Sequence, residues 1–201
     1  MTDSASPADS ANAAAAEEIA EAAALLAFLE AQRASVLAII DGLDAVQLAT
    51  TVLPSGWTPL GLIEHLDHAE RHWFQDVATG SAMPLPWPED PDENDDAADE
   101  HHEHADDDHD TRAVYDAAFT TKRPAEVVFA FYRDQIERAD AVTASTPLSS
   151  LPIGQHNGDG AEDVTDLRSI VLHMIEETAR HLGHLDVVRE LLDGRTGLGP
   201  R

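Results

Sequence analysis

Apolar residues recur every three or four positions in four separate stretches of the chain, which is the spacing of amphipathic helices. The first stretch runs from about Ala14 to Asp44 and is dense in alanine. The others run from about Thr58 to Thr79, from Pro124 to about Thr143, and from Thr165 or Asp166 to Gly194. We find no alternating run typical of strands. The pattern predicts an all-α fold, a four-helix bundle with one long middle connection.

Local signals set the expected helix ends. Thr58 can cap the second helix, and Pro59 suits its first position. Gly80 and Gly194 stand where the second and fourth helices should stop. The expected buried faces are formed by Leu62, Leu66, Ala69, Trp73 and Val77 in the second helix, by Val127, Val128, Phe131, Ile136 and Ala139 in the third, and by Leu167, Ile170, Met174, Leu185, Val188 and Leu192 in the fourth.

Two segments depart from this pattern. Residues 1–13 are rich in Ser, Ala and Asp and are expected to be a disordered tail before a single domain at 14–197. Residues 81–111 begin with four prolines and continue as an acidic loop containing His101, His102, His104 and His109. We interpret this loop as a solvated insert; a lid over a pocket and a loose cation-binding tract are the alternatives.

Charge and cysteine content narrow the function. The 201 residues carry a formal net charge of −27, which argues against nucleic acid and anionic membranes as partners. There is no cysteine, so thiol chemistry would need a thiol on a cosubstrate. No run approaches the length of a membrane span, and the first residues lack a basic signal region. We therefore expect a cytoplasmic protein.

Three residues have the spacing of a metal site. Glu177 and His181 are four apart at the edge of the buried face of the fourth helix, and His65 lies beside the apolar face of the second. Together they would supply three nitrogen and oxygen ligands and leave coordination positions open, as in catalytic metal sites. Such ligands suit Zn, Ni, Fe or Mn, with Zn the first choice. The alternative is that these are ordinary polar residues at helix edges.

Two long stretches resemble a known group of proteins. PSGWTPLGLIEHLDHAERHWF looks like the second helix of the DinB-like superfamily, in the branch common among mycothiol-using bacteria. LRSIVLHMIEETARHLGHLDVVRELLDGRTG is similar to the last helix of that branch. With LLAFLEAQRASVLAIIDGLD from the first helix, the resemblance spans most of residues 22–197. The N-terminal tail and the acidic insert lie outside it.

The resemblance implies a four-helix bundle with a metal-binding triad, often paired as a homodimer. The second-helix ligand of the family matches His65. Its last-helix pair, commonly two histidines, matches Glu177 and His181 here. The mycothiol-dependent maleylpyruvate isomerase relatives are similar in using Glu plus His, so this chain resembles the mycothiol-linked members. His184 replaces a common Gln, and it would support a ligand, act as an acid or base, or lie on the surface.

The resemblance therefore implies a metal-dependent enzyme that transfers the thiol of mycothiol to small electrophiles. The metal would lower the pKa of the cosubstrate thiol. Three alternatives stay open: a metal-dependent hydrolase, a non-catalytic metal- or ligand-binding bundle related to stress, and an interaction module whose acidic loop recruits a partner.

Overall fold

The computed structural model describes residues 7–86, 119–156 and 164–197, and within these ranges it contains helices and no strand. The all-α prediction is confirmed. Of the insert predicted at residues 81–111, the part from residue 87 onward, with its four histidines, lies outside the described ranges. The elements are α1 (Pro7–Ile40), α2 (Ala45–Leu48), α3 (Pro59–Arg71), the π-helix η1 (His72–Val77), α5 (Ala125–Ser145) and α6 (Leu167–Asp193).

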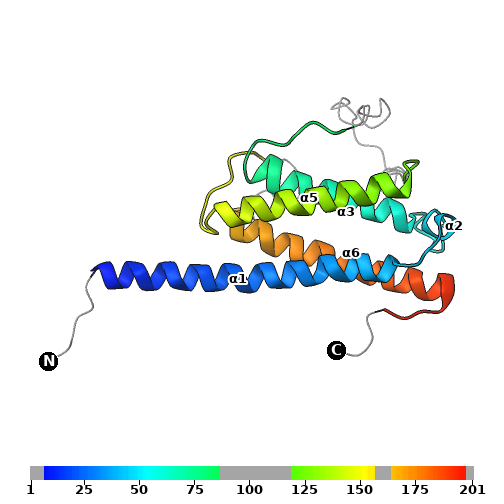
Figure 1. The fold of residues 1–201 in the computed structure, drawn as a ribbon, viewed down its shortest axis with the longest axis horizontal. Helices are drawn as coiled ribbons and strands as arrows, with labels where there is room; N and C mark the ends of the chain where they lie inside the picture. Colours follow the sequence, from blue (N-terminus) through cyan, green and yellow to red (C-terminus); the bar gives the residue numbers. More distant parts are fainter. Residues whose placement is uncertain (1–6, 87–118, 157–163, 198–201) are drawn as a thin grey trace, which may run out of the picture.

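The long helices pack mainly in two pairs. α1 runs along α6, α3 runs along α5, and α3 and η1 also contact α6 (Figure 1). α1 extends past the other helices at its N-terminal end (Figure 1). Two clusters of buried apolar side chains fill the interior, one around Leu66 and Val36 and the other around Phe74 and Met174. The helices that carry the predicted metal ligands, α3 and α6, are therefore neighbours in the packed core.

The expected helix signals are confirmed. The hydroxyl oxygen of Thr58 accepts a hydrogen bond from the Gly61 N–H, and Pro59 stands in the first turn of α3. Asp166 caps α6 and forms a reciprocal capping box with Ser169. Gly194 ends α6 in the left-handed conformation, at φ 76°, where glycine meets no Cβ penalty.

The boundaries differ from the predictions in three places. α1 begins at Pro7, so helix continues into the segment that was expected to be a disordered tail. The short helix α2 follows the turn at Gly42, and its Asp44–Gln47 capping box was not anticipated. The second predicted helix changes at His72 from α-helical to π-helical hydrogen bonding. π-helical turns are rare, and they occur often at functional sites.

Most of the predicted buried face positions are buried. Val127 is an exception at 38% exposed, and Ile19, which belongs to the apolar repeat of the first predicted helix, is 70% exposed. Ile19 lies in the N-terminal half of α1, and Val127 lies in the first turn of α5. Their spacing marked them as inward-facing, but the chain places too little structure beside them to cover them.

A buried ion pair crosses the interior and was not predicted. Arg33 on α1 donates from Nε and Nη2 to the two carboxylate oxygens of Glu70 on α3, each at 2.6 Å. Its Nη1 donates to Asp140 on α5 at 2.9 Å. Arg33 is 2% exposed and Glu70 is 1% exposed. This bidentate pair fixes α1 against α3, because a single orientation satisfies both hydrogen bonds.

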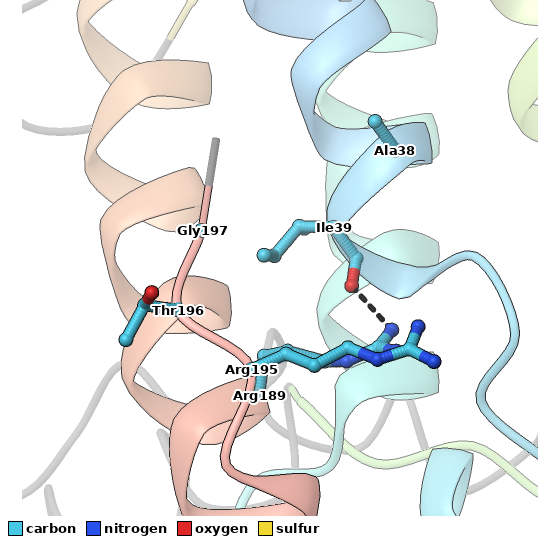
Figure 2. Close-up of a pocket in the computed structure, with 6 residues that line it drawn as sticks. All are labelled: Ala38, Ile39, Arg189, Arg195, Thr196 and Gly197. Atoms are coloured by element: carbon cyan, nitrogen blue, oxygen red, sulfur yellow. Dashed lines mark hydrogen bonds between the residues drawn. The ribbon is translucent and has the colours of Figure 1, made fainter. Parts of the chain in front are cut away.

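Arg189 lies near the C-terminal end of α6 and contacts the end of α1. Its Nη1 donates to the carbonyl oxygen of Ile39 at 2.7 Å (Figure 2). The same nitrogen donates at 2.8 Å to the carbonyl oxygen of Asp41, in the turn that follows α1. These carbonyls would otherwise have no partner within the helix. A small cavity of about 130 Å³ lies here, between α1 and Arg195–Gly197.

The expectation that no segment could span a membrane is not met by α1. Its segment Asn12–Ile40 is long and apolar enough to cross a membrane by length and composition alone, contrary to the sequence expectation. This is weak evidence, because core helices of soluble proteins pass the same test. One face of α1 packs against the bundle, and its Leu29 and Val36 are completely buried.

Candidate metal site

Helix caps and apolar packing fix where the three predicted ligands lie. The Thr58 cap sets the start of α3, and His65 follows about two turns later, between the buried residues Leu62 and Leu66. Glu177 and His181 lie one turn apart on α6. The apolar faces of both helices point into the same core, so the polar residues at the edges of these faces come together.

Glu177 lies between the two histidines. Its Oε1 is 3.0 Å from His65 Nε2 and 2.9 Å from His181 Nε2. One potential ligand atom from each of the three residues lies within 4.8 Å of the other two. The side chains of His65, Glu177 and His181 are 28%, 19% and 8% exposed, so the group is reachable from one side and packed on the other.

The donor set fits a divalent metal ion. The hydrogen bonds from His181 and His65 hold the pKa of Glu177 well below its usual range, so its carboxylate is ionised at neutral pH. Two imidazoles and one carboxylate are the ligands that catalytic zinc sites use, with further positions left for water or substrate. Two of the three separations, from Glu177 Oε1 to each imidazole nitrogen, are close to 3 Å, near the about 3.3 Å between neighbouring ligand atoms on a tetrahedral zinc ion. The buried Nδ1 of His181, on the other side of the ring, has no hydrogen-bond partner among the described residues.

Phe119 covers part of the site and was missed by the sequence analysis. Its ring lies 4.7 Å from the His65 ring and 5.6 Å from the His181 ring, between centroids. Its carbonyl accepts a hydrogen bond from the Thr58 N–H at 3.0 Å. A Cβ at Gly61 would lie 2.0 Å from this carbonyl oxygen, so only glycine allows the approach. No sequence signal links residue 119 to α3, because the contact is long-range.

His184 lies beside the triad and is not part of it. Its ring is 5.7 Å from that of His181 and 5.7 Å from that of Trp57, between centroids. The ring is exposed, yet partial burial and the neighbouring His181 and Arg180 lower its pKa. The structure thus places His184 at the edge of the site, beside the three candidate ligands and not among them.

The remaining described histidines lie elsewhere. His68 contacts Phe131 on α5, and burial lowers its pKa. The other three, His72, His156 and His173, lie near Trp73. None of them belongs to the three-residue group, which is the one such group of three or more ligands among the described residues.

The fold and this group define an all-α protein in which two imidazoles and one carboxylate could hold a metal ion. A family model described as Mycothiol-S-transferase matches residues 24–194, and the chain belongs to this family, which is DinB-like. The resemblance found in the sequence is therefore confirmed. No curated protein and no solved structure gives a significant match.

Proposed function

We propose that the chain is a metal-dependent mycothiol S-transferase with the four-helix DinB-like fold, acting on small electrophiles. One observation supports the proposal most: donor atoms of His65, Glu177 and His181 converge within 4.8 Å in a member of a mycothiol S-transferase family. Zn²⁺ is the first choice for the ion, and Ni²⁺, Fe²⁺ and Mn²⁺ are the alternatives.

Each residue of the site would have its own role in the reaction. His65, Glu177 and His181 would hold the cation, which lowers the pKa of a thiol bound to it. The partial exposure of His65 leaves an approach for the thiol, and the ring of Phe119 packs against the His65 ring. The thiol gives its proton to a base, and its sulfur forms a new S–C bond with the electrophile. The displaced group leaves with the electron pair, or, in an addition, the product takes up a proton.

His184 is our proposal for the base. It is the exposed imidazole that neighbours His181, and it lies outside the ligand group. A thiol proton could pass to its free nitrogen directly or through one water. Replacing His184 with Gln should then lower kcat and flatten its pH profile, while the metal content stays at the wild-type level.

The proposal is tested by following conjugate formation. Purified full-length protein, loaded with Zn²⁺, is incubated with mycothiol and each of several model electrophiles. We expect adduct formation well above the uncatalysed rate, lost in His65→Ala and His181→Ala. A protein that binds Zn²⁺ at the triad but forms no adduct with any electrophile would be a non-catalytic binder. Hydrolysis of an ester without mycothiol would favour a hydrolase instead.

We also propose that the protein is a cytoplasmic homodimer that binds neither membranes nor nucleic acid. The net charge of −27 supports the exclusion of nucleic acid. For the dimer, a stripe of exposed alanines runs along α1 over about six turns. It is formed by Ala16, Ala20, Ala23, Ala27, Ala31, Ala34 and Ala38. Light scattering after size exclusion should give twice the 21.7 kDa chain mass; the monomer mass would dismiss the pairing.

A further inference from the structure

A second pair of imidazoles meets beside η1, apart from the ligand triad. His72 begins η1, two turns after His65, and His156 lies in the connection that follows α5. Nε2 of His72 is 3.1 Å from Nδ1 of His156. Both side chains are partly exposed, so the pair can be reached from solvent. This separation is close to that of two nitrogens on one tetrahedral metal ion, about 3.3 Å.

The segment that carries His156 is held firmly against η1. The Gly154 N–H donates to the Val77 carbonyl at 2.9 Å, and the Ile153 N–H donates to the Ala78 carbonyl at 3.2 Å. A Cβ at Gly154 would lie 1.9 Å from the carbonyl oxygen of Asp76, so the close approach requires glycine. His156 is therefore positioned by the backbone two residues away, which is the kind of pre-organisation that a tight site needs.

The surroundings of His72 favour one tautomer. Its Nδ1 lies 3.8 Å from the Asp76 carboxylate, which also pairs with Arg71. A carboxylate beside Nδ1 favours the proton on that nitrogen and leaves the lone pair of Nε2 directed toward His156. Metal-binding histidines commonly have this arrangement, in which the second nitrogen faces a carboxylate.

Trp73 and a third imidazole, that of His173, lie beside the pair. Trp73 is buried, and its ring contacts His156 at 4.6 Å and His173 at 4.4 Å, between centroids. His173 lies one turn before Glu177 on α6, so the surroundings of the pair extend to within one turn of the triad. The strongly negative chain also concentrates cations around the protein.

We propose that His72 Nε2 and His156 Nδ1 together bind a second divalent transition-metal ion, with water in its remaining coordination positions. The ion is of the class that imidazole prefers, Zn²⁺, Ni²⁺ or Cu²⁺. In the absence of the ion the same two nitrogens share a proton in an N–H···N hydrogen bond. The site does not depend on the proposed transferase activity, because neither residue belongs to the triad.

The test counts Zn²⁺ ions and identifies the nitrogens that bind them. Metal-free, untagged full-length protein is titrated with Zn²⁺ by calorimetry as wild type, His72→Ala, His156→Ala, His181→Ala and the control His68→Gln. We expect each of the first two variants to lose one equivalent that His181→Ala and His68→Gln retain. Histidines outside the described ranges contribute equally to all five proteins and cancel in the comparison.

Ring ¹⁵N spectra of histidine-labelled protein supply the atomic readout. Zn²⁺ should shift Nε2 of His72 and Nδ1 of His156 in the wild type, and it should still shift both in His181→Ala. Far-UV circular dichroism of the metal-free variants shows whether each one folds. Equal stoichiometry in wild type, His72→Ala and His156→Ala, or unshifted ring nitrogens at saturating Zn²⁺, would overturn the second site and leave the triad untouched.

Discussion

Arg33 on α1 holds both carboxylate oxygens of Glu70 on α3, at 2.6 Å each, in a part of the core where neither residue is more than 2% exposed. Glu70 lies five residues after His65, so the pair fixes the helix that carries one ligand of the proposed metal site. Burial raises the pKa of the Glu70 carboxyl, and Arg33 counteracts this by favouring the charged form. The pair thus orders the fold through geometry more than through net electrostatic gain.

Removing the charge of only one partner of this pair should strongly lower the free energy of unfolding. Glu70→Gln leaves a buried guanidinium whose remaining ion-pair partner among the described residues is Asp140, and we expect a loss of about 3–5 kcal/mol in the free energy of unfolding. The double variant Arg33→Met, Glu70→Leu should lose much less, because no charge stays buried. Denaturant unfolding checks both. As a surface control, Asp134→Asn breaks the exposed pair with Arg138 and should cost less than about 1 kcal/mol. A loss for Glu70→Gln as small as this control would contradict the account.

Asp67 should make stability depend on pH. Its carboxyl is completely buried, and burial, with a contribution from Glu64, raises its pKa to about 9. The folded protein keeps this proton up to that pH, whereas the unfolded chain loses it near pH 4. The contribution of Asp67 to the free energy of unfolding is therefore largest at low pH. It falls as the pH rises from the pKa of the unfolded chain to that of the folded protein, by at most about 1.4 kcal/mol per pH unit.

Asp67→Asn removes that titration. The comparison uses metal-free protein, so that no ion at His65 contributes. The free energy of unfolding of the variant, relative to that of the wild type, should rise progressively from pH 5 to pH 8. Unfolding free energies of both proteins at each pH provide the comparison. A difference that stays constant over this range would show that Asp67 titrates normally in the folded protein.

Gly61→Ala should damage the metal site from a distance. Alanine in a helix interior normally stabilises by up to about 1 kcal/mol relative to glycine, but here the new Cβ would meet the carbonyl oxygen of Phe119 at 2.0 Å. We expect a lower melting temperature and weaker Zn²⁺ binding, because Phe119 must move away from His65.

Gly183→Ala is the matched control for this substitution. Gly183 is also inside a helix, and nothing lies within 4 Å of its Cβ position. It should be neutral or slightly stabilising, with unchanged Zn²⁺ affinity. If the two alanine variants behave alike, the contact of Phe119 with α3 does not support the site.

Much of this architecture could be predicted because it depends on local signals. The Thr58–Pro59 start, the Gly194 stop and the spacing of apolar residues such as Leu62 and Leu185 follow from capping and periodicity. The triad residues could be placed at helix edges by the same spacing, and the family resemblance selected them. Whether they bind metal stays a prediction.

Other features depend on long-range contacts that periodicity does not encode. The Arg33–Glu70 pair, the cover provided by Phe119 and the capping of α1 by Arg189 each join residues more than 35 positions apart. One signal was available: Glu70 falls four residues after Leu66, on the apolar face of α3, so a buried partner could have been sought. The exposure of Ile19 shows that periodicity can also predict burial where there is none, because the spacing of apolar residues does not tell how far the neighbouring helices extend.

The central claim is that His65, Glu177 and His181 hold a divalent metal ion, and metal content measures it most directly. Untagged protein is purified without added chelator, dialysed against Zn²⁺ and then metal-free buffer, and analysed by mass spectrometry of the elements. His65→Ala, Glu177→Gln and His181→Ala are compared with wild type and with the control His68→Gln. We predict that each triad variant, but not the control, loses one tightly held equivalent. Wild-type metal content in all three triad variants would contradict the account.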